Sequence, residues 1–153
     1  PPRSTLFPYT TLFRSPISGG TLDQPIGRHP RNRLRMAVNP NGKPAVTHYR
    51  VEEKFRAHAL LSVELETGRT HQIRVHLSWA GYPLVGDALY GRRLRIPAGA
   101  SGKFAETLRG LKRQAVHAHS LTLIHRRTGE SLNWKRPVPP DLAQLLSTLR
   151  PEQ

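Results

Sequence analysis

Apolar and polar side chains alternate with a period of two in one segment, which predicts a strand. Over His58–Glu66, the residues Leu61, Val63 and Leu65 alternate with polar ones. This period places successive apolar side chains on one face of a sheet. A second strand is predicted over Val46–Phe55, and the short gap between the two segments favours a hairpin.

A period close to four then replaces the period of two. Ile73, Leu77 and Ala80 recur at positions i, i+4 and i+7, which is the spacing of one helix face. The pattern predicts a short helix over His71–Ala80. We expect this helix to end at Gly81, because glycine readily takes the backbone conformation of the residue after a helix.

Polar residues at this helix have separate predicted roles. Thr70 directly precedes the helix, and its hydroxyl makes it a suitable N-cap. His71, Arg74 and Ser78 lie on a face that the apolar residues do not occupy. That face is therefore free for chemistry.

The remaining periodic segments complete an α+β pattern. A short helix is predicted over Phe104–Leu111, and a second hairpin over Val116–His125 and Glu130–Trp134. Asp141 is predicted to cap a final helix. The apolar stripe of that helix consists of Leu142, Leu145, Leu146 and Leu149. Because strands and helices do not alternate as in βαβ units, we expect a mixed, mostly antiparallel sheet with short helices.

Two segments lack a periodic pattern. Gly19–Pro44 is rich in Gly, Pro and Asn, which predicts loops. Its arginines cluster around His29 and form either a solvated surface or a phosphate-binding surface. They are Arg28, Arg31, Arg33 and Arg35.

Residues 1–18 differ from the rest of the chain. Thr5-Leu6-Phe7 recurs as Thr11-Leu12-Phe13, and the segment contains no acidic residue. It is similar to translated adapter or vector sequence, and a genuine flexible leader is the alternative. We therefore interpret residues 1–18 as an artefactual or disordered leader, and residues 19–150 as the folded domain.

Charge and composition narrow the function. The 24 Lys and Arg outnumber the 10 Asp and Glu, and the formal net charge is +14. This excess favours a polyanionic partner, with nucleic acid preferred over an anionic membrane. The absence of cysteine excludes disulfides and thiolate metal sites. No apolar run is long enough to span a bilayer, and we expect a cytoplasmic protein.

The eight histidines do not form a convincing metal site. His71 and His76 are five residues apart, which is a poor fit for one helix face. His117 and His119 would share a strand face, but no carboxylate lies close to them in the sequence. We expect neither a metal nor another cofactor.

One continuous motif resembles a known family. Glu66-Thr67-Gly68-Arg69-Thr70-His71-Gln72-Ile73-Arg74-Val75-His76 is similar to the E-T-G-R-T-H-Q-I-R-V-H motif of the RluA/RluD family of ribosomal pseudouridine synthases. Three further segments agree in order: Gly42–Tyr49, Pro83–Asp87 with Tyr90-Gly91, and Arg113–Ala118. The resemblance covers nearly all of the chain outside the leader.

The resemblance implies a function and a missing residue. Members convert uridine to pseudouridine in large-subunit ribosomal RNA, with an aspartate nucleophile in an upstream H-R-L-D motif that is absent here. The chain thus resembles the C-terminal portion of the catalytic domain. We expect this fragment to be inactive alone and monomeric. A non-enzymatic RNA-binding module or decayed remnant is the alternative.

Site residues also follow from the resemblance. Arg74 matches the arginine that orients the catalytic aspartate, so here it is expected to lack its partner, and an ordinary exposed arginine is the alternative. Leu84 matches a side chain that packs on the target base, although core packing is the more common role for leucine. Asp87 is expected to bond to its own turn rather than act as nucleophile. The predicted RNA-binding residues follow instead from position and charge, because free amides at a helix N-terminus favour a phosphate. They are Arg69, Thr70, His71 and Gln72 at the start of the helix, with Arg92 and Arg93 as added positive charge.

Overall fold

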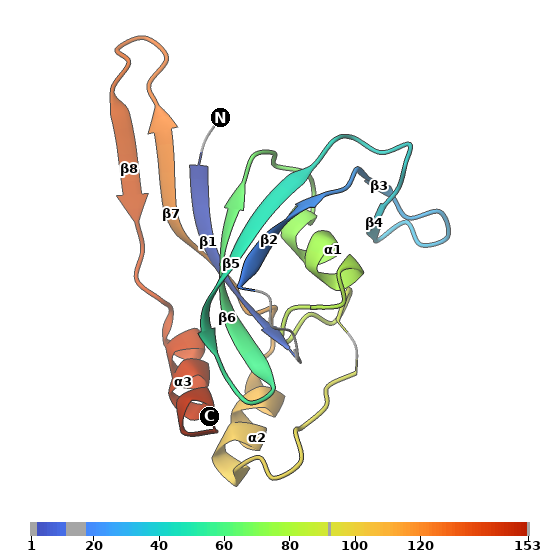
Figure 1. The fold of residues 1–153 in the computed structure, drawn as a ribbon, viewed down its shortest axis with the longest axis vertical. Coiled ribbons are helices and arrows are strands. Elements are labelled where there is room, and N and C mark those ends of the chain that lie inside the picture. The colour runs from blue at the N-terminus through green and yellow to red at the C-terminus, as the bar shows by residue number, and fades with distance from the viewer. Residues whose placement is uncertain (1–2, 12–17, 92, 153) are drawn as a thin grey trace.

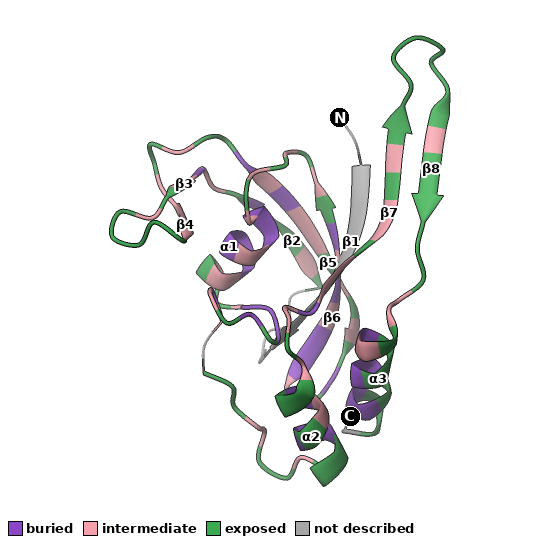
Figure 2. Cartoon of the chain, turned by 180° about the vertical axis from the view of Figure 1, so that it is seen from behind, coloured by how far each residue is buried: buried purple, intermediate pink, exposed green. Residues whose placement is uncertain are grey.

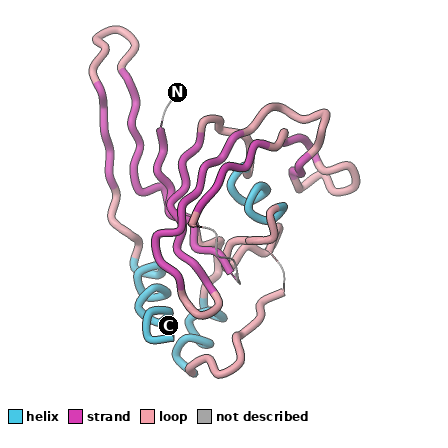
Figure 3. Tube along the Cα trace, viewed as in Figure 1, coloured by secondary structure: helices cyan, strands magenta, loops and turns pink. Residues whose placement is uncertain are grey.

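A twisted antiparallel sheet with helices packed against it forms the body of the protein (Figures 1 and 3). The computed structural model describes residues 3–11, 18–91 and 93–152. The strand order is β2-β5-β6-β1-β7-β8. The strands are β1 (Arg3–Thr11), β2 (Gly19–Asp23), β5 (Val46–Lys54), β6 (His58–Leu65), β7 (Val116–Ile124) and β8 (Ser131–Lys135). The predicted α+β class is confirmed.

Both predicted hairpins are present. Strands β5 and β6 pair in the register Thr47↔Leu65, and Leu61 and Val63 of β6 are buried. Strands β7 and β8 pair in the register Leu121↔Trp134, and this hairpin extends beyond the body of the sheet (Figure 1).

The prediction of loops throughout Gly19–Pro44 is wrong. Strand β2 pairs with β5 along its whole length. Strands β3 (Ile26–Arg28) and β4 (Met36–Val38) form a separate two-stranded ribbon. These strands are held by backbone hydrogen bonds, and two of them are only three residues long. A period of two is not detectable over so few residues.

The predicted leader lies partly outside the described residues, which omit 1–2 and 12–17. The backbone of residues 3–11 forms strand β1, which pairs with β6 and β7. Backbone pairing does not depend on the origin of a sequence. The interpretation of residues 1–18 as an artefactual leader therefore stays a prediction.

The helices agree with prediction in place but not in their caps. They are α1 (Gln72–Trp79), α2 (Gly102–Gly110) and α3 (Pro140–Leu149), followed by a 3-10 turn, η1 (Arg150–Glu152). The N-cap of α1 is His71, with a left-handed φ of 56°, and not Thr70. The N-cap of α3 is Pro139, and Asp141 lies in the first turn. Gly81 follows α1 with φ of 92°, as predicted.

Two main hydrophobic clusters hold these layers together. One lies between α1 and the sheet and includes Leu61, Val63, Ile73, Leu77 and Leu84. The other lies at the end of the sheet, where α2 and α3 pack together (Figure 2). Its members are Phe55, Val85, Phe104, Leu108, Ala115, Leu142, Leu145, Leu146 and Leu149. Each leucine buried in this way stabilises the fold by about 1.5–3 kcal/mol.

A buried chain of hydrogen bonds also joins α1 to the sheet. The Gln72 side-chain amide donates to the Thr47 hydroxyl over 3.0 Å, and that hydroxyl lies 2.8 Å from Nδ1 of His76. The other ring nitrogen, Nε2, lies 2.8 Å from the carbonyl oxygen of Gln24. A carbonyl only accepts, so Nε2 carries the proton and Nδ1 accepts from Thr47. Burial lowers the pKa of His76, which maintains this neutral form.

Two further properties concern the described residues alone. No helix among them is long and apolar enough to cross a membrane. Within the same residues, no group of three or more His, Cys, Asp and Glu side chains is arranged to hold a metal ion.

The buried His58 makes the stability of the fold depend on pH. Burial lowers its pKa from 6.5 to about 4. As the pH falls below 6.5, the unfolded chain therefore binds a proton that the folded chain excludes, and stability is lost. Between pH 7.5 and pH 5, the unfolding free energy of the unchanged protein should fall by about 2 kcal/mol more than that of His58→Leu. Urea unfolding at the two pH values measures this difference. An equal pH dependence in both proteins would contradict it.

Candidate active site

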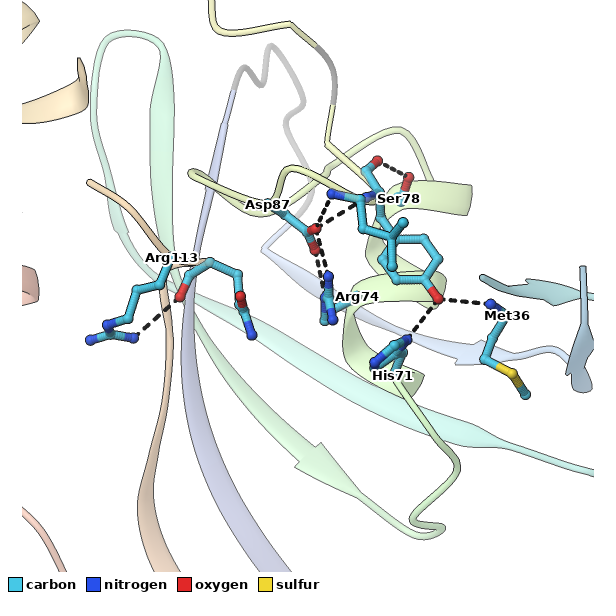
Figure 4. Close-up of polar contacts among 9 residues, drawn as sticks. Met36, His71, Arg74, Ser78, Asp87 and Arg113 are labelled. Carbon is cyan, nitrogen blue, oxygen red and sulfur yellow. Dashed lines mark hydrogen bonds and ion pairs between the residues drawn. The ribbon is translucent and has the colours of Figure 1, made fainter. Parts of the chain in front are cut away.

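A bidentate ion pair between Arg74 and Asp87 forms the centre of the candidate site (Figure 4). Arg74 lies on α1, and Asp87 lies in the turn that follows residues 83–86. Nε of Arg74 donates to Oδ2 and Nη2 donates to Oδ1, each over 2.8 Å. The Asp87 side chain is fully buried and the Arg74 side chain is 16% exposed. Arg74 therefore pairs with a carboxylate of this chain, and the expectation that the catalytic aspartate is missing beside it stays a prediction.

Asp87 is held as a carboxylate by its own turn. Its Oδ1 accepts hydrogen bonds from the backbone amides of Leu89 and Tyr90, each over 3.0 Å. Burial raises the pKa of Asp87, but the hydrogen bonds from Arg74 and these amides outweigh burial and hold the pKa below its ordinary value. The hydrogen bond to Asp87 in turn raises the pKa of Arg74. The predicted local role of Asp87 is confirmed.

Tyr90 connects three parts of the site. Its hydroxyl accepts a hydrogen bond from the Met36 amide over 2.7 Å and lies 2.8 Å from Nδ1 of His71. Its backbone carbonyl accepts from the Ser78 hydroxyl. The Arg74 guanidinium lies 4.8 Å from the centre of its ring, within cation–π range. The sequence pattern suggested that the polar face of α1 is free. In the structure this face packs against residues 87–90.

The turn that carries Asp87 is fixed from its other side. Gly86 has φ of 72°, and a Cβ atom there would lie 2.2 Å from the carbonyl oxygen of Arg113. The amide of Ala115 donates to the carbonyl of Val85 over 2.8 Å. Arg113 itself makes a bidentate pair with Asp141 at the start of α3. Only glycine at position 86 allows the backbone to approach the Arg113 carbonyl this closely.

A cleft of about 450 Å³ adjoins the turn. Its lining residues combine an apolar floor with a basic rim. The apolar part consists of Pro83, Leu84, Val85, Leu94, Leu108 and Leu111. The cations are Arg93, Arg95 and Arg109, and Asp87 also borders the space. Apolar and cationic groups therefore border one cleft, as in many small-molecule sites.

Comparison with known proteins shows similarity to one family. A sequence model described as RNA pseudouridylate synthase matches residues 9–79. The chain is 55% identical over 134 residues to "Ribosomal large subunit pseudouridine synthase D" of Xanthomonas campestris, covering 88% of this chain and 40% of the relative. The protein of the same name from Pseudomonas aeruginosa is 57% identical over 136 residues, covering 89% of this chain and 42% of the relative.

The chain is thus similar to RNA pseudouridylate synthases over most of its described length. It spans about two fifths of the length of the curated relatives that it matches. Among solved structures, human RNA pseudouridylate synthase domain containing 4 superposes with a TM-score of 0.72 and 26% identity. The superposition covers 97% of this chain and 62% of that one. The α+β fold therefore agrees with a pseudouridylate synthase domain.

Four of the predicted RNA-binding residues surround the start of α1. Arg69 donates through Nε to the carbonyl of Pro44 and remains partly exposed, and Thr70 is exposed. The ring of His71 faces Tyr90, and its pKa is lowered by burial and by the nearby Arg74.

Gln72 is buried instead. Its carbonyl oxygen accepts from the Thr67 hydroxyl and the Arg69 amide, and its amide donates to Val46 and Thr47. A side chain with all of these bonds satisfied holds the loop in place. We therefore withdraw Gln72 from the RNA-contacting residues.

The other predicted residues lie around the cleft or outside the described residues. Leu84 is only 3% exposed and belongs to the core beneath α1, although it also lines the cleft. Arg93 is exposed at the cleft rim. Arg92 lies outside the described residues. The roles of Arg74 and Leu84 in catalysis stay predictions. Tyr90 was not singled out from the sequence, because its contacts come from separate segments.

Because Arg74 and Asp87 form an ion pair, we expect their substitutions to have non-additive effects on the unfolding free energy. Asp87→Asn leaves the Arg74 guanidinium partly buried without its counter-charge, and we expect a loss of about 3 kcal/mol in unfolding free energy. Arg74→Met should cost a similar amount. The double variant should cost less than the sum of the two by more than about 1 kcal/mol. Urea unfolding of all four proteins measures the coupling, and strictly additive losses would refute it.

Tyr90→Phe should release the ribbon of β3 and β4 from the site. The variant keeps the aromatic ring beneath Arg74 but removes the acceptor of the Met36 amide. We expect the Met36 amide to exchange with solvent at least about tenfold faster, because its hydrogen bond is lost. Hydrogen-exchange mass spectrometry with fragment-level resolution measures the rate. The amide of Val63 in the sheet serves as the internal control and should be unchanged.

Proposed function

We propose that this chain is the C-terminal portion of the catalytic domain of a pseudouridine synthase that acts on large-subunit ribosomal RNA. The observation that carries the proposal is the identity of 54–57% to proteins named ribosomal large subunit pseudouridine synthase D, over 87–89% of this chain. The formal charge of +14 supports an RNA partner. The proposal includes a cytoplasmic location and a monomer.

In this proposal Arg74 positions the nucleophile that another segment supplies. Asp87 engages Nε and Nη2 of Arg74, and among the described residues Nη1 has no hydrogen-bond partner. An aspartate carboxylate that approached Nη1 would meet a guanidinium already fixed in direction. The positive charge would keep that aspartate ionised and ready to attack the uridine. Asp87 therefore acts as the support for Arg74 rather than as the nucleophile.

No described aspartate of this chain is suited to attack a uridine beside Arg74. Asp87 is fully buried and bound by Arg74 and two backbone amides. Asp141 is paired with Arg113, and Asp23 ends strand β2. This observation keeps the second candidate, a non-enzymatic RNA-binding module, in consideration. The two functions differ in whether residues 19–150 can complete an active enzyme.

A hybrid enzyme tests the proposal. Residues 19–150 would replace the matching C-terminal part of the Escherichia coli relative, which is 54% identical over 133 residues. We expect the hybrid to form pseudouridine in large-subunit RNA, because the relative supplies the remaining segments. The chain alone should form none. Pseudouridine is measured by mass spectrometry after cyanoethylation, and a folded but inactive hybrid would favour the binding module.

The same hybrid separates the role of Arg74 from a general role of charge. Arg74→Lys keeps the charge but loses the bidentate geometry, so we expect kcat to fall at least about 100-fold with RNA affinity unchanged. Arg127→Lys makes the same chemical change on the exposed turn between β7 and β8 and should leave kcat unaltered. Equal losses in both variants would exclude a positioning role for Arg74.

A further inference from the structure

A basic ribbon lies beside the candidate site. We call residues 26–38 the arm: strands β3 and β4 with the loop between them. The arm extends from the side of the molecule opposite the β7–β8 hairpin (Figures 1 and 2). Its exposed cations are Arg28, Arg31 and Arg33. No acidic residue occurs between Asp23 and Glu52, so the arm itself carries no negatively charged side chain.

The loop of the arm has a defined shape. Nδ1 of His29 accepts hydrogen bonds from the amides of Arg31 and Asn32, over 3.2 and 3.1 Å. The amide of His29 donates to the carbonyl of Arg35, and the Asn32 side chain accepts from the amide of Leu34. These bonds fix the backbone, so its exposed arginines project from a preorganised loop. Preorganised cations lose less entropy when they bind a polyanion.

A groove continues the basic surface from the arm toward α1. Its volume is about 450 Å³. The cations that line it are Arg28, Lys43 and Arg69. Arg69 is held in place by its bond to the Pro44 carbonyl, and Asn41 and Thr70 add polar groups to the lining. Three cations along one groove suit successive phosphates of a nucleic-acid strand.

Tyr90 connects this surface to the candidate site. Its hydroxyl accepts from the Met36 amide at the start of β4, and the guanidinium of Arg35 lies 5.2 Å from its ring centre. The guanidinium of Arg74 lies 4.8 Å from the centre of the same ring. Tyr90 therefore links the arm to Arg74 through both its hydroxyl and its ring.

We propose that the arm and its groove bind the phosphate backbone of the RNA and guide the strand to the candidate site. The phosphates lie along Arg28, Arg31, Arg33, Lys43 and Arg69. Tyr90 is a positioning residue that holds the arm in register with Arg74. The identity of the polyanion as RNA rests on the proposed function, whereas the location of the surface rests on the geometry.

Salt-dependent binding to the full chain tests the proposal. The probe is a fluorescein-labelled hairpin of large-subunit ribosomal RNA, and affinity is measured by fluorescence anisotropy between 50 and 300 mM KCl, about the range in which phosphate contacts dominate. The test variant carries Arg28→Gln, Arg31→Gln and Arg33→Gln. The matched control carries Arg126→Gln, Arg127→Gln and Arg136→Gln, three exposed arginines of the opposite hairpin. Both variants lower the net charge by three, and circular dichroism verifies their folding.

The two variants should differ in both affinity and salt slope. In the arm variant, the slope of log affinity against log salt should decrease in magnitude by about 2–3, since each lost phosphate contact contributes about 0.7–0.9. Its affinity at 100 mM KCl should fall at least about tenfold. The control should change its slope by less than about 1. Equal effects of the two variants, or a larger effect of the control, would overturn the proposal.

The outcomes also separate this proposal from the proposed function. If the hybrid enzyme is inactive while the arm variant still loses phosphate contacts, the arm remains an RNA-binding surface on a non-enzymatic module. If the hybrid is active but the arm variant binds as the control does, the catalytic assignment holds and the arm proposal fails. Tyr90→Phe should weaken binding with the charge unchanged, and an unaltered slope and affinity would exclude its positioning role.

Discussion

The ion pair of Arg74 and Asp87 determines how the parts of this chain meet. An unpaired guanidinium or carboxylate would be costly at this degree of burial, so the helix and the turn are stable only when they come together. The segment that leads to Asp87 joins two clusters of the hydrophobic core, because Leu84 belongs to the cluster beneath α1 and Val85 to the cluster at α2 and α3. The ion pair holds the end of this segment against α1.

A second set of polar contacts gives α1 its position on the sheet. The helix has only eight residues and would be marginal in isolation. Gln72 and His76, one turn apart, both reach Thr47 in β5. Each group in this network has a partner, so the network restricts rotation and sliding of the helix without leaving a buried donor unmet. The direction in which Arg74 projects follows from this restraint.

The sequence predicted the parts of the fold that depend on local pattern. Leu61 and Val63 revealed strand β6, and Ile73 and Leu77 revealed helix α1, because their periods extend over several residues. The three-residue strands of the arm were missed, since their pairing is made by the backbone.

Within the site, the resemblance identified Arg74, but its partner Asp87 is 13 residues away in the sequence and no spacing rule connects them. Tyr90 was missed for the same reason, as its hydroxyl contacts Met36, 54 residues earlier. Thr70 was predicted as a cap from its residue type, but the backbone of His71 takes the left-handed conformation and occupies that position.

The contact between Gly86 and Arg113 also affects the order in which the chain can mature during synthesis. Arg74 and Asp87 leave the ribosome before Ala115, whose amide bonds the carbonyl of Val85. Arg113 is in turn fixed by Asp141, in the first turn of α3. The turn beside Arg74 therefore reaches its final restraint only after α3 has been synthesised. A nascent chain holds an unfinished site until this helix has emerged.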